Sequence, residues 1–105
     1  MSFGLELIAE ERQRQIESEG WTDQHDDGHY SEELARAAAC YATPKFWRSS
    51  AVLNVLWPWR ETWWKPTPND RIRELAKAGA LIAAEIDRLH RGAVAQESAD
   101  AKAAS

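Results

Sequence analysis

The sequence has little that would support covalent or redox chemistry. Cys40 is the only cysteine among 105 residues, which excludes an intramolecular disulfide and a four-cysteine zinc site. Its neighbours are mostly alanines, so we expect a small buried apolar residue rather than a reactive thiolate. A glycine-rich phosphate loop and a Gly-x-Ser-x-Gly nucleophile motif are both missing. We therefore assign no catalytic residue from the sequence.

Long apolar segments are absent as well. The longest apolar run, residues 78–84, is far too short to span a bilayer. The first ten residues contain acidic side chains and lack the basic and apolar regions of a secretory signal. We therefore expect a cytoplasmic protein without a membrane partner.

An excess of basic residues is missing too. The chain has 13 lysines and arginines against 17 acidic residues, for a formal net charge of −4. Broad binding to nucleic acid requires a basic surface, so nucleic acid is not an expected partner. A small anionic ligand stays possible, because a single pocket can be basic in an acidic protein.

The spacing of apolar residues predicts an all-α fold with three main helices in a single domain of residues 1–92. Leu5, Ile8 and Ile16 share one face of a helix over residues 3–19, which Gly20 would end. Ser31 is a suitable N-cap for a short alanine-rich helix that ends before residue 44. Residues 44–68 lack a sustained period and are expected to form a long Trp/Pro-rich loop. Within this loop, a helical turn and a short strand both fit residues 49–56.

The last predicted helix has Thr67 as its N-cap and Gly92 as its end, followed by a disordered tail over residues 93–105. Its apolar positions repeat at spacings of three and four: Ile72, Leu75, Gly79, Ile82, Ile86 and Leu89. This repeat is typical of a coiled-coil seam. It predicts a homo-oligomer that associates through this helix, and the glycine within it predicts a close helix crossing.

Tryptophan is the unusual component of the sequence, with six residues: Trp21, Trp47, Trp57, Trp59, Trp63 and Trp64. A core this small cannot easily hide six indoles, so we expect some to face a ligand or a partner. Trp57, Trp59 and Trp64 lie close to Arg60 and Lys65 in the chain. Rings beside cations suit a flat base and a phosphate together. The alternative, that these tryptophans only pin the loop to the helices, fits equally well.

A second candidate site lies in residues 21–30, where two histidines and three carboxylates fall within seven positions. Imidazole with carboxylate is a ligand set for zinc, iron or manganese, and carboxylates alone suit magnesium on a phosphate substrate. Aspartates in such a loop also form turns and caps. We predict ligand contacts for Thr22, His25 and Asp26, and neither a resident metal nor another cofactor.

Several motifs together resemble a family of small phage and prophage proteins. The likeness extends over about residues 7–91 and rests on Glu19-Gly20-Trp21-Thr22, His25-Asp26-Asp27, Trp57-Pro58-Trp59, Trp64-Lys65-Pro66 and Lys77-Ala78-Gly79-Ala80-Leu81. The resemblance implies a protein of the host cell cytoplasm and a possible role against host defence. It implies no particular activity.

A shorter likeness concerns the N-terminal half. Glu11-Arg12 followed by Glu19-Gly20-Trp21-Thr22 is similar to the signature of ryanodine-receptor repeat domains. Those are small helical modules, some of which bind adenine nucleotides against tryptophans. The resemblance implies a ring-stacking role for Trp21, and we place Arg12 in the same candidate site.

The helical plan is also similar to the MazG-type nucleoside triphosphate pyrophosphohydrolases, which hold magnesium with a Glu-Glu-x-x-Glu helix and a later Glu-x-x-Asp helix. Neither Glu10-Glu11 nor Glu32-Glu33 has the third glutamate of the first motif. In the second motif, Arg88 stands three residues after Glu85, where the family has an aspartate. A hydrolase of this type would need Glu33, Glu85 and the loop at 25–27 to hold its magnesium.

Our prediction from the sequence is a protein that binds a nucleotide or a nucleotide-derived molecule and sequesters a host immune signal. The predicted contacts are Arg12, Trp21, Thr22, His25, Asp26, Trp57, Trp59, Arg60, Trp64 and Lys65. Two alternatives are a magnesium-dependent nucleotide pyrophosphohydrolase and an inhibitor that docks on a host protein.

Overall fold

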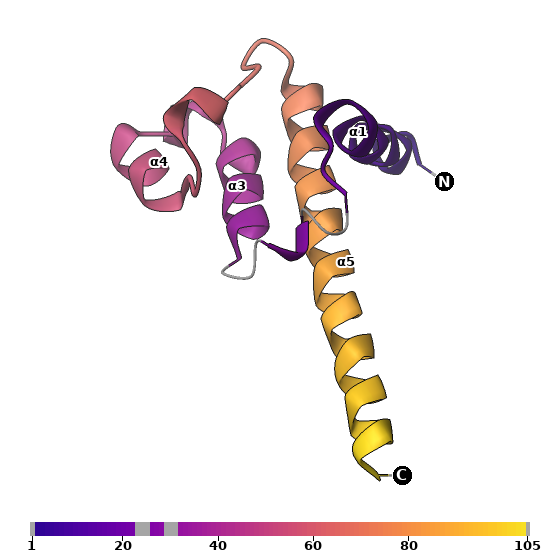
Figure 1. Ribbon diagram of the computed structural model, residues 1–105. Helices are drawn as coiled ribbons and strands as arrows, with labels where there is room; N and C mark the ends of the chain where they lie inside the picture. The colour runs from indigo at the N-terminus through magenta and orange to yellow at the C-terminus, as the bar shows by residue number, and fades with distance from the viewer. Residues whose placement is uncertain (1, 23–25, 29–31, 105) are drawn as a thin grey trace.

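The computed structural model describes residues 2–22, 26–28 and 32–104, and within these ranges the chain forms helices and no strands. In chain order the elements are α1 (Phe3–Glu19), α3 (Glu33–Ala42), the 3-10 turn η1 (Lys45–Trp47), α4 (Ser50–Leu56), the 3-10 turn η2 (Glu61–Trp63) and α5 (Arg71–Ala104). Figure 1 shows α5 as the long axis, with α3 along one side, α1 crossing it on the other and α4 beyond α3. The predicted all-α fold with three main helices, α1, α3 and α5, is confirmed.

Helix α1 has the predicted bounds. The Ser2 hydroxyl accepts a hydrogen bond from the Leu5 N–H at 3.2 Å, which caps the first turn. Gly20 takes the left-handed conformation with φ 71°, and the Trp21 N–H donates to the Gln15 carbonyl. Glycine adopts this backbone without strain, so the predicted end of the helix is confirmed. The face that α1 buries is not the apolar face predicted from Leu5, Ile8 and Ile16. The buried residues of α1 are Glu11 and Gln15.

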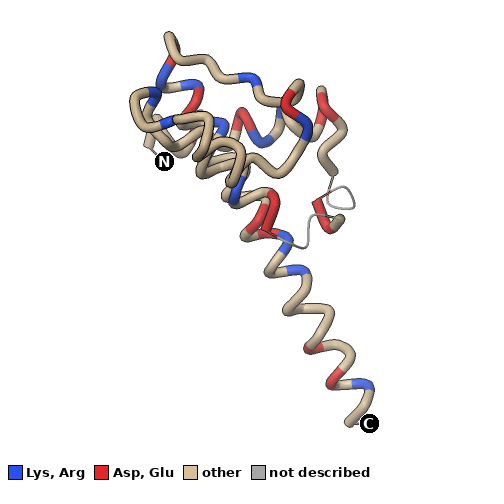
Figure 2. The backbone as a smooth tube through the Cα atoms, turned by 90° about the vertical axis from the view of Figure 1, so that its left-hand side faces the viewer, with Lys and Arg blue, Asp and Glu red and all other residues tan. Residues whose placement is uncertain are grey.

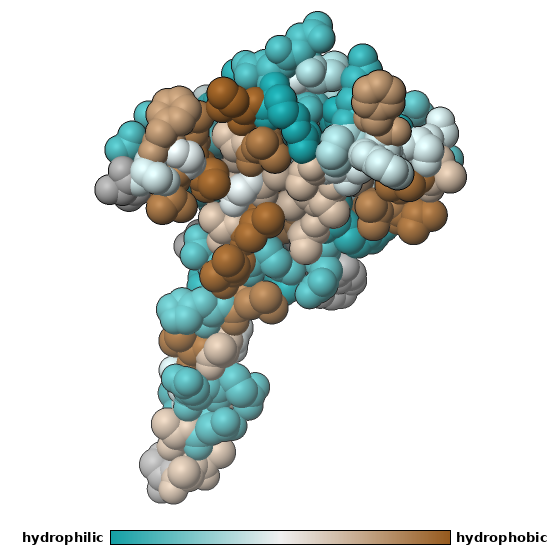
Figure 3. All heavy atoms as spheres, turned by 180° about the vertical axis from the view of Figure 1, so that it is seen from behind, coloured by the Kyte–Doolittle hydropathy of each residue, from teal (hydrophilic) through white to brown (hydrophobic). Residues whose placement is uncertain are grey.

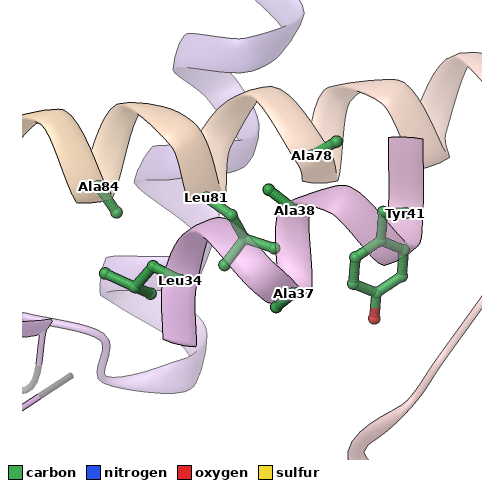
Figure 4. Packing of buried hydrophobic residues seen from close by; sticks show 7 residues of the cluster. All are labelled: Leu34, Ala37, Ala38, Tyr41, Ala78, Leu81 and Ala84. Carbon is green, nitrogen blue, oxygen red and sulfur yellow. The ribbon is translucent and has the colours of Figure 1, made fainter. Parts of the chain in front are cut away.

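The core lies between α3 and α5 and is built mainly from alanine. Ala37 and Ala38 of α3, with Ala78 and Ala84 of α5, are at most 3 % exposed. Leu81 extends from α5 into the space between the two helices (Figure 4). Small side chains let the helix axes approach closely. Four partly buried aromatic rings pack against this cluster: Trp21, Trp57, Trp59 and Trp64.

The start of α3 differs from the prediction. Its N-cap is Glu32, which has a positive φ of 64° and makes no side-chain capping bond. The predicted N-cap, Ser31, lies outside the described residues. A left-handed backbone at a non-glycine residue is uncommon. The capping residues in the sequence give no sign that Glu32 would adopt it.

The start of α5 also differs from the prediction. Asp70, rather than Thr67, caps the helix, because the Asp70 Oδ1 accepts the Arg73 N–H at 3.1 Å. The Thr67 N–H instead donates to the Glu74 Oε2 at 3.0 Å. The Thr67 hydroxyl donates to the Asp70 carbonyl at 3.5 Å, so it does not accept a helix N–H as an N-cap would.

The predicted end of the last helix at Gly92 is wrong, since α5 continues to Ala104 through the segment for which the sequence predicts a disordered tail. Gly92 does not take a left-handed backbone, and the residues after it are rich in alanine, the strongest helix former. The radius of gyration of 15.7 Å exceeds the roughly 13 Å of a compact chain of this length. The projecting end of α5 accounts for the difference (Figure 1). No helix among the described residues is long and apolar enough to cross a membrane.

The Trp/Pro-rich segment 44–68 is not a structureless loop. It contains η1, α4 and η2, and the undecided stretch 49–56 is helical. The Ser49 hydroxyl accepts the Val52 N–H at 3.2 Å and caps α4 in the usual way. The segment therefore covers one end of α3 and brings its tryptophans back onto the α3–α5 core.

Candidate ligand-binding site

A pocket of about 470 Å³ opens between α1, α3, α5 and the segment 57–65. Its volume falls within the range of small-molecule sites in proteins. Five aromatic residues line it: Trp21, Tyr41, Trp57, Trp59 and Trp63. Polar side chains line it as well, including Glu11, Arg14, Gln15 and Glu19 of α1 together with Lys65 and Lys77. A pocket of this composition can hold a flat, partly polar molecule.

The aromatic wall is a chain of rings in mutual contact. Trp21 and Trp59 have ring centroids 6.1 Å apart, and Trp59 meets Trp57 edge to face at 5.4 Å. Trp57 in turn contacts Trp64 at 5.1 Å, and Trp64 contacts Tyr41 at 4.7 Å. These distances are typical of favourable aromatic pairs. Each ring therefore packs against the next along the wall.

The segment that carries this wall is anchored by one buried carboxylate. Glu74 of α5 is fully buried and accepts hydrogen bonds from Arg48 at 2.8 and 3.2 Å, from Arg71 at 3.2 Å and from the Thr67 N–H. Burial alone would raise the pKa of Glu74, but the hydrogen bonds and charge of Arg48, with those of Arg71 and Thr67, outweigh it and lower the pKa. Glu74 is therefore ionised and ties both ends of the segment to α5.

The same network positions two rings of the wall. The Arg48 guanidinium lies 5.6 Å from the centroid of Trp64, a cation–π contact. The Lys65 N–H donates to the Tyr41 hydroxyl at 3.3 Å. Arg71 donates to the Tyr41 carbonyl at 2.9 Å, at the C-terminal end of α3 where a cation is favourable.

The α1 side of the pocket carries a charged triplet. Arg14 forms two hydrogen bonds with Glu11, at 3.0 and 2.6 Å, and a third with Glu19 at 3.0 Å. The hydrogen bond with Glu11 is the largest influence and raises the pKa of Arg14. The two carboxylates thus occupy this arginine. Figure 2 shows how basic and acidic residues are interspersed along the chain, rather than gathered in one patch of a single sign.

Lys77 supplies a second, more buried cation. Its side chain is nearly buried, its Nζ donates to the Lys65 carbonyl at 2.9 Å, and it lies 5.4 Å from the Tyr41 ring centroid. Burial, followed by the positive charge of Arg73, lowers the pKa of Lys77. An ammonium has three N–H donors. An anion in the pocket would therefore find further donors here and would favour the charged form.

Gln15 is the most buried polar side chain of the pocket, at 2 % exposure. Within the part of the chain that the structure describes, its Oε1 has no hydrogen-bond partner. Buried acceptors in proteins are nearly always paired. The Gln15 Oε1 is covered by other atoms of the chain, so it is a buried polar atom beside the pocket rather than an exposed acceptor.

The pocket brings together four of the predicted contacts, Trp21, Trp57, Trp59 and Lys65. Trp64 packs behind them and lines a neighbouring hollow of about 270 Å³. Arg60 is exposed and contributes its carbonyl, which accepts the Trp57 Nε1–H at 3.0 Å.

The residues predicted around the acidic loop have supporting positions. Arg12 pairs with the fully buried Asp26 and donates to the Trp21 carbonyl at 3.4 Å, so this pair lies behind Trp21 and holds it. The Thr22 N–H donates to the Gly20 carbonyl, and His25 lies outside the described residues. None of these three described residues, Arg12, Thr22 and Asp26, lines the pocket.

Carboxylates considered for magnesium are paired with arginines. Asp27 accepts hydrogen bonds from Arg91 at 2.6 and 3.1 Å, and Glu85 accepts from Arg88 at 2.5 and 3.1 Å. Among the described residues, no three His, Cys, Asp or Glu side chains gather as a metal-binding group.

Nine pocket residues are not among the contacts predicted from the sequence: Glu11, Arg14, Gln15, Glu19, Tyr41, Thr62, Trp63, Lys77 and Leu81. A signal for three of them is present. Glu11, Gln15 and Glu19 are spaced by four residues, which places them on one face of a helix. A polar stripe beside the apolar one marks a second contact surface. Tyr41 and Lys77 have no such local signal.

Comparison of the chain with models of protein families, with curated proteins and with solved structures finds no match. The chemistry of the pocket therefore rests on its own geometry.

Proposed function

We propose that the pocket binds a nucleotide-type small molecule, with a flat ring against the tryptophans and an anionic group at the lysines. One observation supports this most directly: a continuous wall of indoles and the two cations Lys65 and Lys77 line the same pocket. Stacking on an aromatic ring is open to every base, and a lysine ammonium is a common phosphate partner.

The positions of the charges suggest how the ligand lies. Arg14 is held by Glu11 and Glu19, so it is less available to an anion than the lysines. Lys65 is exposed at the rim, where a phosphate stays partly hydrated. The ring would then lie deeper, against Trp59 and Trp21.

Isothermal titration calorimetry with nucleoside mono-, di- and triphosphates and cyclic dinucleotides tests the proposal. We expect saturable binding of at least one nucleotide, and a loss of about 1–3 kcal/mol of binding free energy in Trp59→Ala. Trp47→Ala is the matched control, because Trp47 is 73 % exposed and lies outside the pocket. Binding to none of these compounds would contradict the proposal.

The fate of the ligand separates binding from catalysis. Binding without turnover would let the protein sequester a host signal, as its likeness to phage proteins implies. We expect the bound nucleotide to be recovered unchanged after incubation with magnesium. Recovery of hydrolysed product, abolished by EDTA, would support the pyrophosphohydrolase alternative instead.

We also propose that two copies of the chain pair weakly along the α5 stripe, defined as Ile82, Ile86 and Leu89. These side chains are 47–61 % exposed, and Figure 3 shows hydrophobic side chains along α5 on this side of the molecule. Residues at heptad spacing pack well against a copy of themselves. Ile8 of the same chain fills the position over Gly79, which shortens the predicted seam.

The short stripe sets the expected strength of pairing. A stable dimer buries about 800 Å² on each partner, and three side chains provide only part of that area. We therefore expect a monomer–dimer equilibrium that depends on concentration, measured by sedimentation equilibrium. Ile86→Lys should remove the dimer and Asp87→Asn, on the neighbouring exposed position, should not. A wild-type chain that stays monomeric at every concentration would contradict this proposal.

A further inference from the structure

A second, smaller hollow shares part of its wall with the pocket described above. It has a volume of about 270 Å³, and Ser50, Leu53 and Asn54 of α4 are among its lining residues. Trp57 and Trp59 line both this small hollow and the main pocket of about 470 Å³. A volume of 270 Å³ is below the usual range of an independent small-molecule site. The small hollow can therefore hold one part of a ligand whose other part lies in the main pocket.

A short ridge of five consecutive residues separates the two spaces. Glu61 and Trp64 line the small hollow, whereas Thr62, Trp63 and Lys65 line the main pocket. Four of the five are exposed, and Trp64 is half-buried. A ligand that reaches both spaces must cross this ridge in contact with water. A charged, hydrated linker crosses it without a desolvation cost.

The charges beside the ridge indicate which part of a ligand lies where. Lys65 on the ridge and Arg60 immediately before it are exposed cations, so a phosphate that crosses the ridge would pass near both. The Glu61 carboxylate lines the small hollow and, when ionised, only accepts hydrogen bonds. It disfavours a phosphate there and favours a group with N–H donors. The small hollow thus suits a base that stacks on Trp57 or Trp64.

We infer that the main pocket and the small hollow together bind one dinucleotide-type ligand, with a base in each space and the phosphate link across the ridge. The inference rests on the proposed function. It narrows the ligand class by the number of rings, because stacking on tryptophan tolerates every base but the two spaces together provide for two.

Nucleotides with the same base and a different number of rings test this inference. ADP is compared with the linear dinucleotide pApA and with cyclic di-AMP, and GDP with pGpG and cyclic di-GMP. Each of these compounds has two phosphates, so the second ring is the main difference. We expect calorimetry to show at least one dinucleotide bound at one molecule per chain. Its binding should be about 5- to 150-fold tighter than that of the matching diphosphate, the range for one further stacked base.

A double variant fills the small hollow from α4. Ser50 and Asn54 are four residues apart and both line it, so Ser50→Leu with Asn54→Leu places two larger apolar side chains on the same helix face. We expect the dinucleotide to bind this variant within about threefold of the diphosphate, less than one stacked base contributes. Ala51→Leu with Val55→Leu is the matched control. Both residues are exposed on α4 with the same spacing and line neither space, so the advantage of the dinucleotide should be kept.

The outcomes separate this inference from the proposed function. If no mononucleotide or dinucleotide binds the wild-type protein, both fail. If nucleotides bind but dinucleotides bind no more tightly than the diphosphates, only the shared site is overturned. One dinucleotide for every two chains would also overturn it, as would an unchanged advantage in the filled variant, once circular dichroism shows that it folds. If the filled variant does not fold, the wild-type comparison decides by itself.

Discussion

Helix α5 has two faces that differ in the size of their side chains more than in their polarity. The buried face has four alanines, of which Ala78, Ala80 and Ala84 are at most 3 % exposed, beside Leu81 and three charged residues. The outward face carries large aliphatic residues that are 46–61 % exposed: Ile72, Leu75, Ile82, Ile86 and Leu89. Apolar character therefore does not decide which face is buried. Close approach to α3 decides it, because the alanines let the two helices pack tightly around Leu81.

The two faces also differ in how they would tolerate change. The inner face combines tight packing with the buried carboxylate Glu74, so both volume and charge are constrained. On the outer face, Ile72 and Leu75 line an apolar hollow with Phe3, Leu7 and Ile8 of α1, and Ile8 covers Gly79. Substitutions along one helix should therefore have very different effects on the free energy of unfolding.

The largest expected effect is at Glu74. Replacement with alanine leaves the nearly buried Arg48 without its carboxylate, and removal of one partner of a buried ion pair costs about 3–5 kcal/mol. Urea unfolding followed by circular dichroism measures the change. Asp87→Ala, on the exposed side of α5, is the control. A loss below about 1 kcal/mol would mean that Glu74 does not anchor the segment.

The pH dependence of stability gives a second view of Glu74. Its pKa is lowered in the folded protein, so its stabilising contribution is fully present above the unfolded pKa of about 4.3. The contribution is lost as the pH falls through the lower, folded pKa. We expect the wild-type protein to lose more stability than Glu74→Gln as the pH is lowered through this window. Parallel curves for the two proteins would be inconsistent with a lowered pKa.

An intermediate effect is expected at Gly79, where the inner and outer faces meet. A Cβ atom at this position would lie 2.4 Å from the Ile8 Cδ1 and 2.5 Å from its Cγ1. We expect Gly79→Ala to destabilise the protein by about 1–2 kcal/mol, because overpacking outweighs the gain in helix propensity.

The Ile8→Ala background tests the cause of this effect. Without the isoleucine side chain, Gly79→Ala should become stabilising by up to about 1 kcal/mol. The double-mutant cycle, measured by urea unfolding, then gives a coupling energy between the two sites. A penalty that stays the same in both backgrounds would place the strain elsewhere.

A small effect is expected on the outer face. At concentrations where the protein is monomeric, Ile86→Ala should change the free energy of unfolding by less than about 0.5 kcal/mol. Leu81→Ala on the inner face, where Leu81 is 1 % exposed, should cost about 2–5 kcal/mol. Similar costs at the two positions, measured by urea unfolding, would show that α5 does not have two distinct faces.

The smallest effect is expected from the projecting end of α5. Residues 92–104 are exposed throughout, and an isolated helix of this length is marginally stable in water. A chain that stops after Arg91 should keep its free energy of unfolding within about 0.5 kcal/mol and lose helical circular dichroism signal. A large loss of stability would indicate contacts of this end with the rest of the molecule or with a second copy.

The sequence predicts the helices whose ends depend on neighbouring residues. The bounds of α1 follow from the apolar spacing and from Gly20, whose left-handed backbone is local chemistry. The end of α5 was not predictable from Gly92, because a glycine can also stay within a helix when the residues after it favour one. At the start of α5 two neighbouring residues were candidate caps, and Asp70 rather than Thr67 bonds the helix N–H, at Arg73.

The candidate site shows the same division. Aromatic composition points to Trp21, Trp57, Trp59 and Lys65, all of which line the pocket. The local pattern could not show that Arg12 would support a ring rather than contact a ligand, because its partner Asp26 is 14 positions away. Lys77 enters the pocket only through the packing of α5 against the segment 57–65. The roles of Arg12 and Lys77 can be assigned only from the three-dimensional structure, which places distant segments of the chain together.

The ring-to-ring contacts give the protein an optical property of its own. Indoles that lie within about 5–6 Å of one another share their electronic excitation, and the geometry of Trp21, Trp59, Trp57 and Trp64 is suited to such coupling. The circular dichroism of these rings should show paired bands of opposite sign, and their fluorescence should reflect energy transfer along the chain of rings. A change in the position of one indole would alter the circular dichroism and fluorescence of all the coupled rings. These spectra therefore report whether the aromatic wall keeps its arrangement.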